Sequence, residues 1–140
     1  MRSTLYTSLL IFGLLAFVAG CKEKTVSSDE KKPISLPHYE VISESETPMG
    51  KAVALLVPGT HSKETYVGLV KAVVTKLDPS NLQIYTSKAA FEAVKKPDVN
   101  DAYRKGFILV FRKEAQTAGE IWWMQEDGPL AALSGTVTRL

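Results

Sequence analysis

An uncharged apolar segment near the N-terminus divides this chain of 140 residues into parts that cannot share one fold. Residues 5–20 include 12 apolar residues and no charge, whereas residues 22–37 carry seven charges in 16 positions. The remaining 103 residues, 38–140, mix apolar and polar positions as an ordinary domain does. That length is enough for one folded domain and too short for two.

The apolar segment has the layout of a secretory signal. Met1 and Arg2 give it a positive start, and Leu9 to Val18 form an apolar run that only Gly13 interrupts. A membrane-spanning helix needs about 20 apolar residues, and this run is much shorter. An uncleaved signal anchor is therefore the less favoured interpretation, and residues 1–20 are predicted to be a signal peptide.

The residues that end this segment, Val18-Ala19-Gly20-Cys21, resemble the lipobox of bacterial lipoproteins. An aliphatic residue lies three positions before the chain's one cysteine, and small residues fill the positions between them. The resemblance implies that the peptide is cut before Cys21 and that the Cys21 sulfur is acylated, with diacylglycerol and palmitate as the expected lipid groups. A diacylated or triacylated Cys21 forms a stable lipid anchor in the membrane. The alternative is an ordinary secretory peptide in which Cys21 has no role.

The residue after the cysteine bears on localisation. In enterobacterial lipoproteins an Asp at this position retains the protein in the inner membrane, and this chain has Lys22 there. The resemblance therefore implies an exported protein in the outer membrane, with its domain facing the periplasm. Residues 21–37 show no helical or strand period, and we expect a flexible tether. With Cys21 bound to lipid, no thiol remains for a disulfide or a zinc site.

Residues 38–140 alternate between strand and helix patterns. Lys63 to Lys76 has the clearest helical spacing, a shorter helix is predicted over Lys88 to Lys95, and residues 96–105 are predicted to be a loop. Strands are predicted at 39–44, 52–57, 82–86, 106–112, 120–125 and 136–139, the last after a short helical turn.

This order of elements predicts an α+β fold, β-β-α-β-(α)-β-β, with a mostly antiparallel sheet and helices packed on one face. The domain is similar only to small uncharacterised envelope domains of the same strand order. That resemblance implies no activity.

The loop between the second strand and the first helix is a candidate for a small site. Free N–H groups at a helix N-terminus favour an anion, and Thr60, His61, Ser62 and Lys63 add hydrogen-bond donors. The loop, residues 58–63, could serve a small ligand, or a hydrolase with His61 as base and Ser62 or Thr60 nearby. A capped helix beside a solvent-exposed histidine is the simpler account of the same residues.

Trp122 and Trp123 are neighbours in a predicted strand, so their side chains point to opposite faces. At most one can enter the helix-covered core. The other then presents a large ring for a protein, peptide or glycan contact. The alternative is that Leu130, Leu133 and Leu140 pack over this second ring.

The chain carries few groups suited to catalysis. It has two histidines, His38 and His61, and no metal-binding motif, so no metal or cofactor is expected. A net charge of +2 gives no reason to expect nucleic acid as a partner. The sequence favours a lipid-anchored, non-enzymatic envelope lipoprotein that binds a protein or peptide partner, over a cell-envelope hydrolase or a small-ligand-binding lipoprotein.

Overall fold

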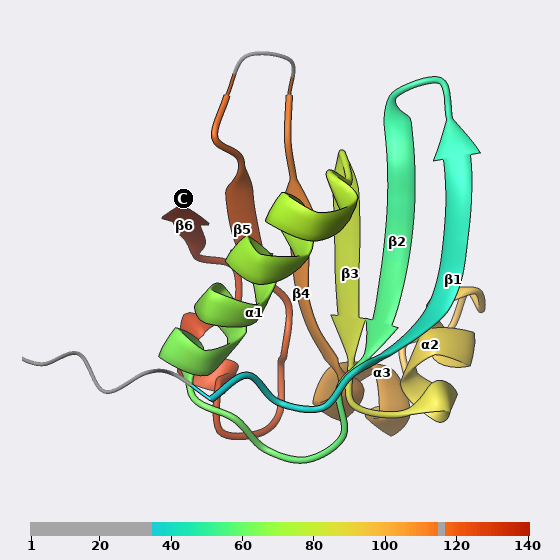
Figure 1. The fold of residues 1–140 in the computed structure, drawn as a ribbon. Helices are drawn as coiled ribbons and strands as arrows, with labels where there is room; N and C mark the ends of the chain where they lie inside the picture. The colour runs from blue at the N-terminus through green and yellow to red at the C-terminus, as the bar shows by residue number, and fades with distance from the viewer. Residues whose placement is uncertain (1–34, 115–116) are drawn as a thin grey trace, which may run out of the picture. The chain divides into compact units, whose positions relative to one another are not determined.

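One six-stranded sheet organises residues 35–114 and 117–140, the part of the chain that the computed structural model describes (Figure 1). The strands lie in the order in which they occur in the chain. Among these strands only β2 and β3 run parallel, and the other neighbouring pairs are antiparallel. The predicted α+β fold with a mostly antiparallel sheet is confirmed. The strands are β1 (Glu40–Thr47), β2 (Gly50–Leu56), β3 (Asn81–Tyr85), β4 (Phe107–Arg112), β5 (Glu120–Trp123) and β6 (Val137–Arg139).

Helix α1 (Lys63–Leu77) connects the two parallel strands and lies across one face of the sheet (Figure 1). The Ser62 hydroxyl begins the helix by accepting a hydrogen bond from the Thr65 N–H at 3.2 Å. Asp78 follows the helix in a left-handed conformation, φ 45°, and donates its N–H to the Val74 carbonyl at 3.0 Å. The helix predicted from apolar spacing is confirmed.

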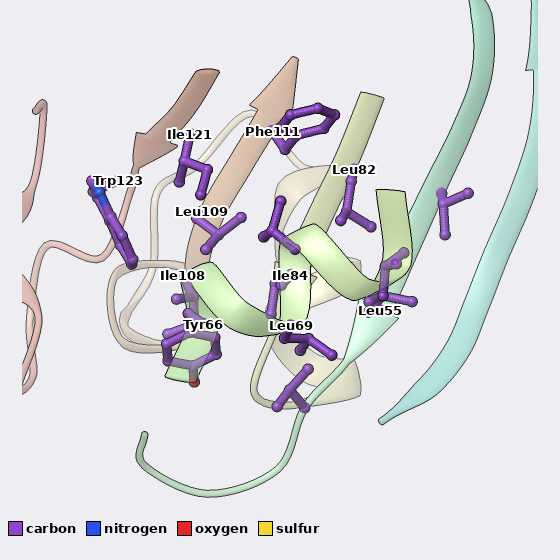
Figure 2. Close-up of a cluster of buried hydrophobic side chains, with 14 of the residues drawn as sticks. Leu55, Tyr66, Leu69, Leu82, Ile84, Ile108, Leu109, Phe111, Ile121 and Trp123 are labelled. Carbon is purple, nitrogen blue, oxygen red and sulfur yellow. The ribbon is translucent and has the colours of Figure 1, made fainter. Parts of the chain in front are cut away.

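The main hydrophobic core lies between α1 and the sheet (Figure 2). The buried residues of the helix recur every three or four positions, so they form one stripe that faces the strands. The members of the core are Val53, Leu55, Val57, Tyr66, Leu69, Val70, Val73, Leu82, Ile84, Ile108, Leu109, Phe111, Ile121, Trp123 and Leu130. Strands β2 to β5 all contribute to it, so one continuous layer of side chains holds the sheet to the helix.

Helices α2 (Lys88–Val94) and α3 (Asp101–Gly106) pack against the opposite face, at the end of the sheet where β2 and β3 finish (Figure 1). The prediction that the helices share one face is therefore wrong in this respect. Tyr85 and Phe107 stack on that second face with 4.9 Å between ring centroids. Helix α1 cannot cover these rings from the other side, and α2 and α3 do so instead.

The prediction of a loop over residues 96–105 is wrong at residues 101–105, which belong to helix α3. Asn100 caps this helix by accepting a hydrogen bond from the Tyr103 N–H at 3.1 Å. Tyr103 packs edge-on against Phe107 with 5.4 Å between centroids. Six residues are too few to show a helical period in the sequence, and tertiary packing of this kind provides most of the stability of so short a helix.

The C-terminal segment has the elements predicted for it. A short 3₁₀ helix, η1 (Ala131–Leu133), precedes β6, which pairs with β5. Leu130, Leu133 and Leu140 pack into the main core. Within residues 35–114 and 117–140, no helix combines the length and the apolar character needed to cross a membrane.

Candidate functional site

The two adjacent tryptophans lie on opposite faces of the sheet, as strand alternation predicts. Trp123 is 1% exposed in the main core (Figure 2), and its indole N–H donates to Thr138 Oγ1 at 2.9 Å. Trp122 is 41% exposed on the other face. One large aromatic ring is thus buried and the other reaches solvent.

The alternative that C-terminal leucines cover Trp122 is wrong. Leu130 is buried in the main core, and Leu133 and Leu140 pack against that core. Leu140 also lines a hollow beside Trp122, but Trp122 remains 41% exposed. The residue that β6 places opposite Trp122 is Val137, which is itself exposed. The second ring therefore lies open beside an exposed valine.

Two rows of side chains cross the sheet beyond α2 and α3, on the same face as those helices. Each row takes one residue from every strand, because the cross-strand pairs continue from β6 to β1. The tryptophan row is Val137, Trp122, Val110, Gln83, Ala54 and Ser43, and the charged row is Arg139, Glu120, Arg112, Asn81, Ala52 and Ser45. Trp122 and the valines beside it therefore lie next to a row of charged and amide side chains.

Two hollows in this face meet at Arg112. One, of about 770 Å³, extends from Arg112 past Gln83 to the exposed Met49 in the β1–β2 turn. The other, of about 400 Å³, extends from Arg112 to Trp122. Arg112 and Glu114 line both hollows, which we call together the Arg112 trough. The trough therefore joins the polar centre of the sheet to the exposed tryptophan.

Within the described residues, Arg112 makes no salt bridge, whereas the two other cations that line the trough are each bound to a carboxylate. Lys113, next to it in the chain, lowers the pKa of the Asp78 carboxyl by hydrogen bonding to it and by its charge. The two pairs are Arg139 Nε to Glu120 Oε1 at 3.2 Å and Lys113 Nζ to Asp78 Oδ1 at 2.8 Å. Arg112 thus keeps its hydrogen-bonding capacity for an external group.

The predicted loop site is divided in the structure. Thr60 and His61 line a hollow of about 440 Å³ that extends to the segment between β5 and η1. Ser62 caps α1 and Lys63 begins that helix, and neither lines the hollow. The structure therefore brings two of the four predicted residues to one cavity.

His61 is held by contacts that do not include a nucleophile. Its Nε2 lies 2.9 Å from the Pro58 carbonyl oxygen and donates there, since a carbonyl oxygen only accepts. Its ring meets Tyr66 edge-on with 5.6 Å between centroids. The Ser62 hydroxyl lies 3.2 Å from Thr65 Oγ1 instead. In this arrangement His61 and Ser62 do not form the hydrogen-bonded pair that nucleophilic catalysis requires.

A buried glutamine that the sequence does not predict lines the same hollow. Gln125 is 5% exposed, its Nε2 donates to the Lys105 carbonyl at 2.7 Å, and its Oε1 accepts from the Leu130 N–H at 2.9 Å. These bonds tie the segment after β5 to the end of α3. A single glutamine at the end of a strand gives no pattern from which this role could be predicted.

Sequence reasoning also misses Arg112 and Gln83. Each is a polar residue in a strand of mostly apolar residues, which is the signal that could have marked them. Their common position with Trp122, however, depends on how β3, β4 and β5 pair. Register between strands is not visible in any one strand alone.

In residues 35–114 and 117–140, no three His, Cys, Asp or Glu side chains gather as a metal-ligand set. Cys21, the predicted lipidation site, lies outside the residues that the structure describes.

Comparisons with protein-family models, with curated proteins and with solved structures found no match for this chain.

Proposed function

We propose that this chain is a lipid-anchored bacterial envelope lipoprotein whose small, non-enzymatic domain binds a protein or peptide partner. The observation that carries this proposal is the exposure of Trp122, next to Val137, on the sheet face beyond α2 and α3. A tryptophan ring can bury about 150–250 Å² of surface with little loss of conformational freedom. Tryptophan is accordingly enriched among the residues that dominate binding energy at protein interfaces.

The anchor in this proposal is acylated Cys21, which the sequence Val18-Ala19-Gly20-Cys21 supports. Each buried CH₂ group contributes about 0.8 kcal/mol to membrane affinity, so two or more acyl chains hold a protein stably. The proposed location is the outer membrane, with the domain facing the periplasm. A domain held there meets membrane-bound partners at a raised effective concentration, so a modest contact surface suffices.

Uptake of labelled palmitate tests the anchor. The full-length wild-type chain, expressed in a bacterium that processes lipoproteins, should incorporate the label, and Cys21→Ala should incorporate none. Unlabelled wild-type protein would contradict the anchor and would leave the proposal for the domain untouched.

Site-specific photo-cross-linking in the native envelope tests partner binding. A photoreactive residue at Val137, beside Trp122, should give an adduct of defined mass, and the same residue at Lys71 should not. Lys71 is a matched control because it is exposed on α1, on the other face of the sheet. Adding Trp122→Ala should reduce the adduct about tenfold. Equal adducts from both positions, or no effect of Trp122→Ala, would contradict a partner at this face.

A small-ligand-binding lipoprotein is the second candidate, because a hollow of about 440 Å³ lies beside Thr60 and His61. A thermal-shift screen of small anions and metabolites tests it. A compound that stabilises wild type and Trp122→Ala equally, but not His61→Ala, would favour this candidate over the first. A hydrolase is less well supported, because His61 Nε2 is bonded to Pro58. Any hydrolytic activity that His61→Ala retains in full would exclude His61 as its base.

A further inference from the structure

We infer that the partner offers an extended peptide segment in which a carboxylate lies two residues from an apolar side chain, with Arg112 binding the carboxylate and Trp122 the apolar group. This inference rests on the proposed function and deepens it, because it names the chemistry of the partner.

The charge of the trough favours an anion at one position. Arg112 is exposed and makes no salt bridge with the carboxylates that the structure describes, although Glu120 lies directly opposite it on β5. The Glu120 carboxylate is bound to Arg139 on the far side, at 3.2 Å. A guanidinium presents a planar fork of donors that matches a carboxylate in two parallel hydrogen bonds. Arg112 is therefore the natural contact for an acidic side chain or a peptide C-terminus.

The amides beside Arg112 add donors to the same position. Gln83 Oε1 accepts a hydrogen bond from the Tyr85 hydroxyl at 2.6 Å. Gln83 lines the trough, and because this bond occupies its Oε1, its NH₂ group is available as a donor. Asn81, opposite Arg112 on β3, brings a second amide. Donors from Arg112 and these amides suit carboxylate and carbonyl oxygens.

The spacing of Arg112 and Trp122 fits one extended segment. Arg112 pairs with Glu120 across the β4–β5 ladder, and Trp122 is two residues further along β5. Such diagonal neighbours are roughly 7–8 Å apart. Alternate side chains of an extended peptide lie on one side of it, roughly 7 Å apart. A carboxylate and an apolar side chain at positions i and i+2 therefore reach both groups at once.

Glu114 makes the inference sharper, because it lines both hollows with Arg112 and is exposed. It would repel an acidic peptide and attract a basic one. Removing its charge should therefore strengthen the proposed contact, whereas removing the charge of Arg112 should weaken it. A basic ligand would reverse both signs.

The test uses the full-length chain, held in mild detergent, and a phage-displayed library of random dodecapeptides. Selected peptides are synthesised, and their affinities are measured by fluorescence polarisation against wild type and the variants Arg112→Gln, Arg112→Lys, Glu114→Gln and Trp122→Ala. Lys71→Gln, which removes an exposed positive charge on α1, is the matched control. Circular dichroism confirms that each variant is folded before it is compared.

The expected result is enrichment of peptides with Asp or Glu two positions from a large apolar residue. Arg112→Gln and Trp122→Ala should each weaken binding about tenfold, and Arg112→Lys should restore it only in part. Glu114→Gln should tighten binding about twofold or more, and Lys71→Gln should leave it unchanged.

Three results would overturn the inference: enrichment of basic or uncharged peptides, binding that Arg112→Gln does not weaken, or no enriched peptide at all. None of these removes the proposed function, because the photo-cross-linking at Val137 tests a partner of any chemistry. Loss of the cross-link together with an enriched acidic peptide would show the reverse, a peptide site without the proposed envelope partner.

Discussion

The two faces of the sheet are completed by different kinds of residue. On the α1 face, the inward side chains from β2 to β5 are apolar and buried, and the one indole N–H among them is hydrogen-bonded internally. On the opposite face, the aromatic cluster under α2 and α3 gives way to Gln83, Asn81 and Arg112. Stability is therefore concentrated on one face. The polar side chains of the other face lie outside both hydrophobic clusters, and the proposed partner binding would explain their identity.

The largest expected effect is on the free energy of unfolding and distinguishes the buried tryptophan from the exposed one. Trp123→Ala removes a buried ring from the main core and should lower the free energy of unfolding by about 3–5 kcal/mol. Trp122→Ala removes an exposed ring and should lower it by about 1 kcal/mol or less. Urea denaturation followed by circular dichroism measures both. Similar losses from the two variants would mean that the faces do not differ in stability as described.

A second comparison concerns two glycines, Gly119 beside the main core and Gly135 in open space. A Cβ at Gly119 would lie 2.2 Å from Phe111 Cε2, and Gly119 has φ 101°. Gly119→Ala should therefore cost about 2–3 kcal/mol through overpacking and backbone strain together. Gly135 has φ 76° and nothing within 4 Å of its added Cβ. Gly135→Ala should cost about 1 kcal/mol, and an equal cost would show that backbone strain alone decides both.

Alkaline pH should destabilise the fold more through Tyr66, which is buried on the α1 face, than through Tyr103, which is partly buried on the other face. Burial raises the pKa of Tyr66 to about 12, whereas an unfolded tyrosine titrates near pH 10. The stability that Tyr66 contributes is complete below pH 10 and is lost as the pH rises toward 12, by about 2 kcal/mol. Tyr66→Phe should remove this part of the alkaline destabilisation. Burial also raises the pKa of Tyr103, but this side chain is only half-buried. Tyr103→Phe should therefore remove a smaller part of the alkaline destabilisation.

The smallest effect concerns the open face and separates stability from binding. Val137→Thr keeps the volume of an exposed side chain opposite Trp122 and should change the free energy of unfolding by no more than about 0.5 kcal/mol. The cross-linking or peptide contact at Trp122 should nevertheless weaken, because the apolar surface beside the ring is smaller. A stability change above about 1 kcal/mol would mean that Val137 belongs to the folded core.

Much of the α1 face can be predicted from the sequence, because its signals are local. The spacing from Tyr66 to Val73 predicts the helix stripe, and Ser62 predicts where the helix starts. Strand alternation separates Trp122 from Trp123 without knowledge of their neighbours. These features hold in the structure because the residues that specify them lie within one element.

The opposite face could not be predicted in the same way, because its residues come together only through pairing between strands. Arg112 and Gln83 lie next to Trp122 by virtue of the β3–β4 and β4–β5 registers. Helix α3 depends on the packing of Tyr103 against Phe107 rather than on a helical period. The structure also divides the predicted loop site, with Thr60 and His61 at the hollow and Ser62 and Lys63 outside it. This division could not be predicted, since a cavity depends on what packs beside it.

The order of the strands in the sheet also affects how the molecule reaches this structure. Each strand pairs with the next strand along the chain, from β1 to β6. Contacts between consecutive segments close short loops, which lowers the entropic barrier and favours fast folding. Two pairs among the described strands must wait for intervening helices: α1 separates β2 from β3, and α2 and α3 separate β3 from β4. A chain that emerges N-terminus first, from a ribosome or from an export channel, can therefore add each new strand to the free edge of the sheet, without ever inserting one between strands already joined.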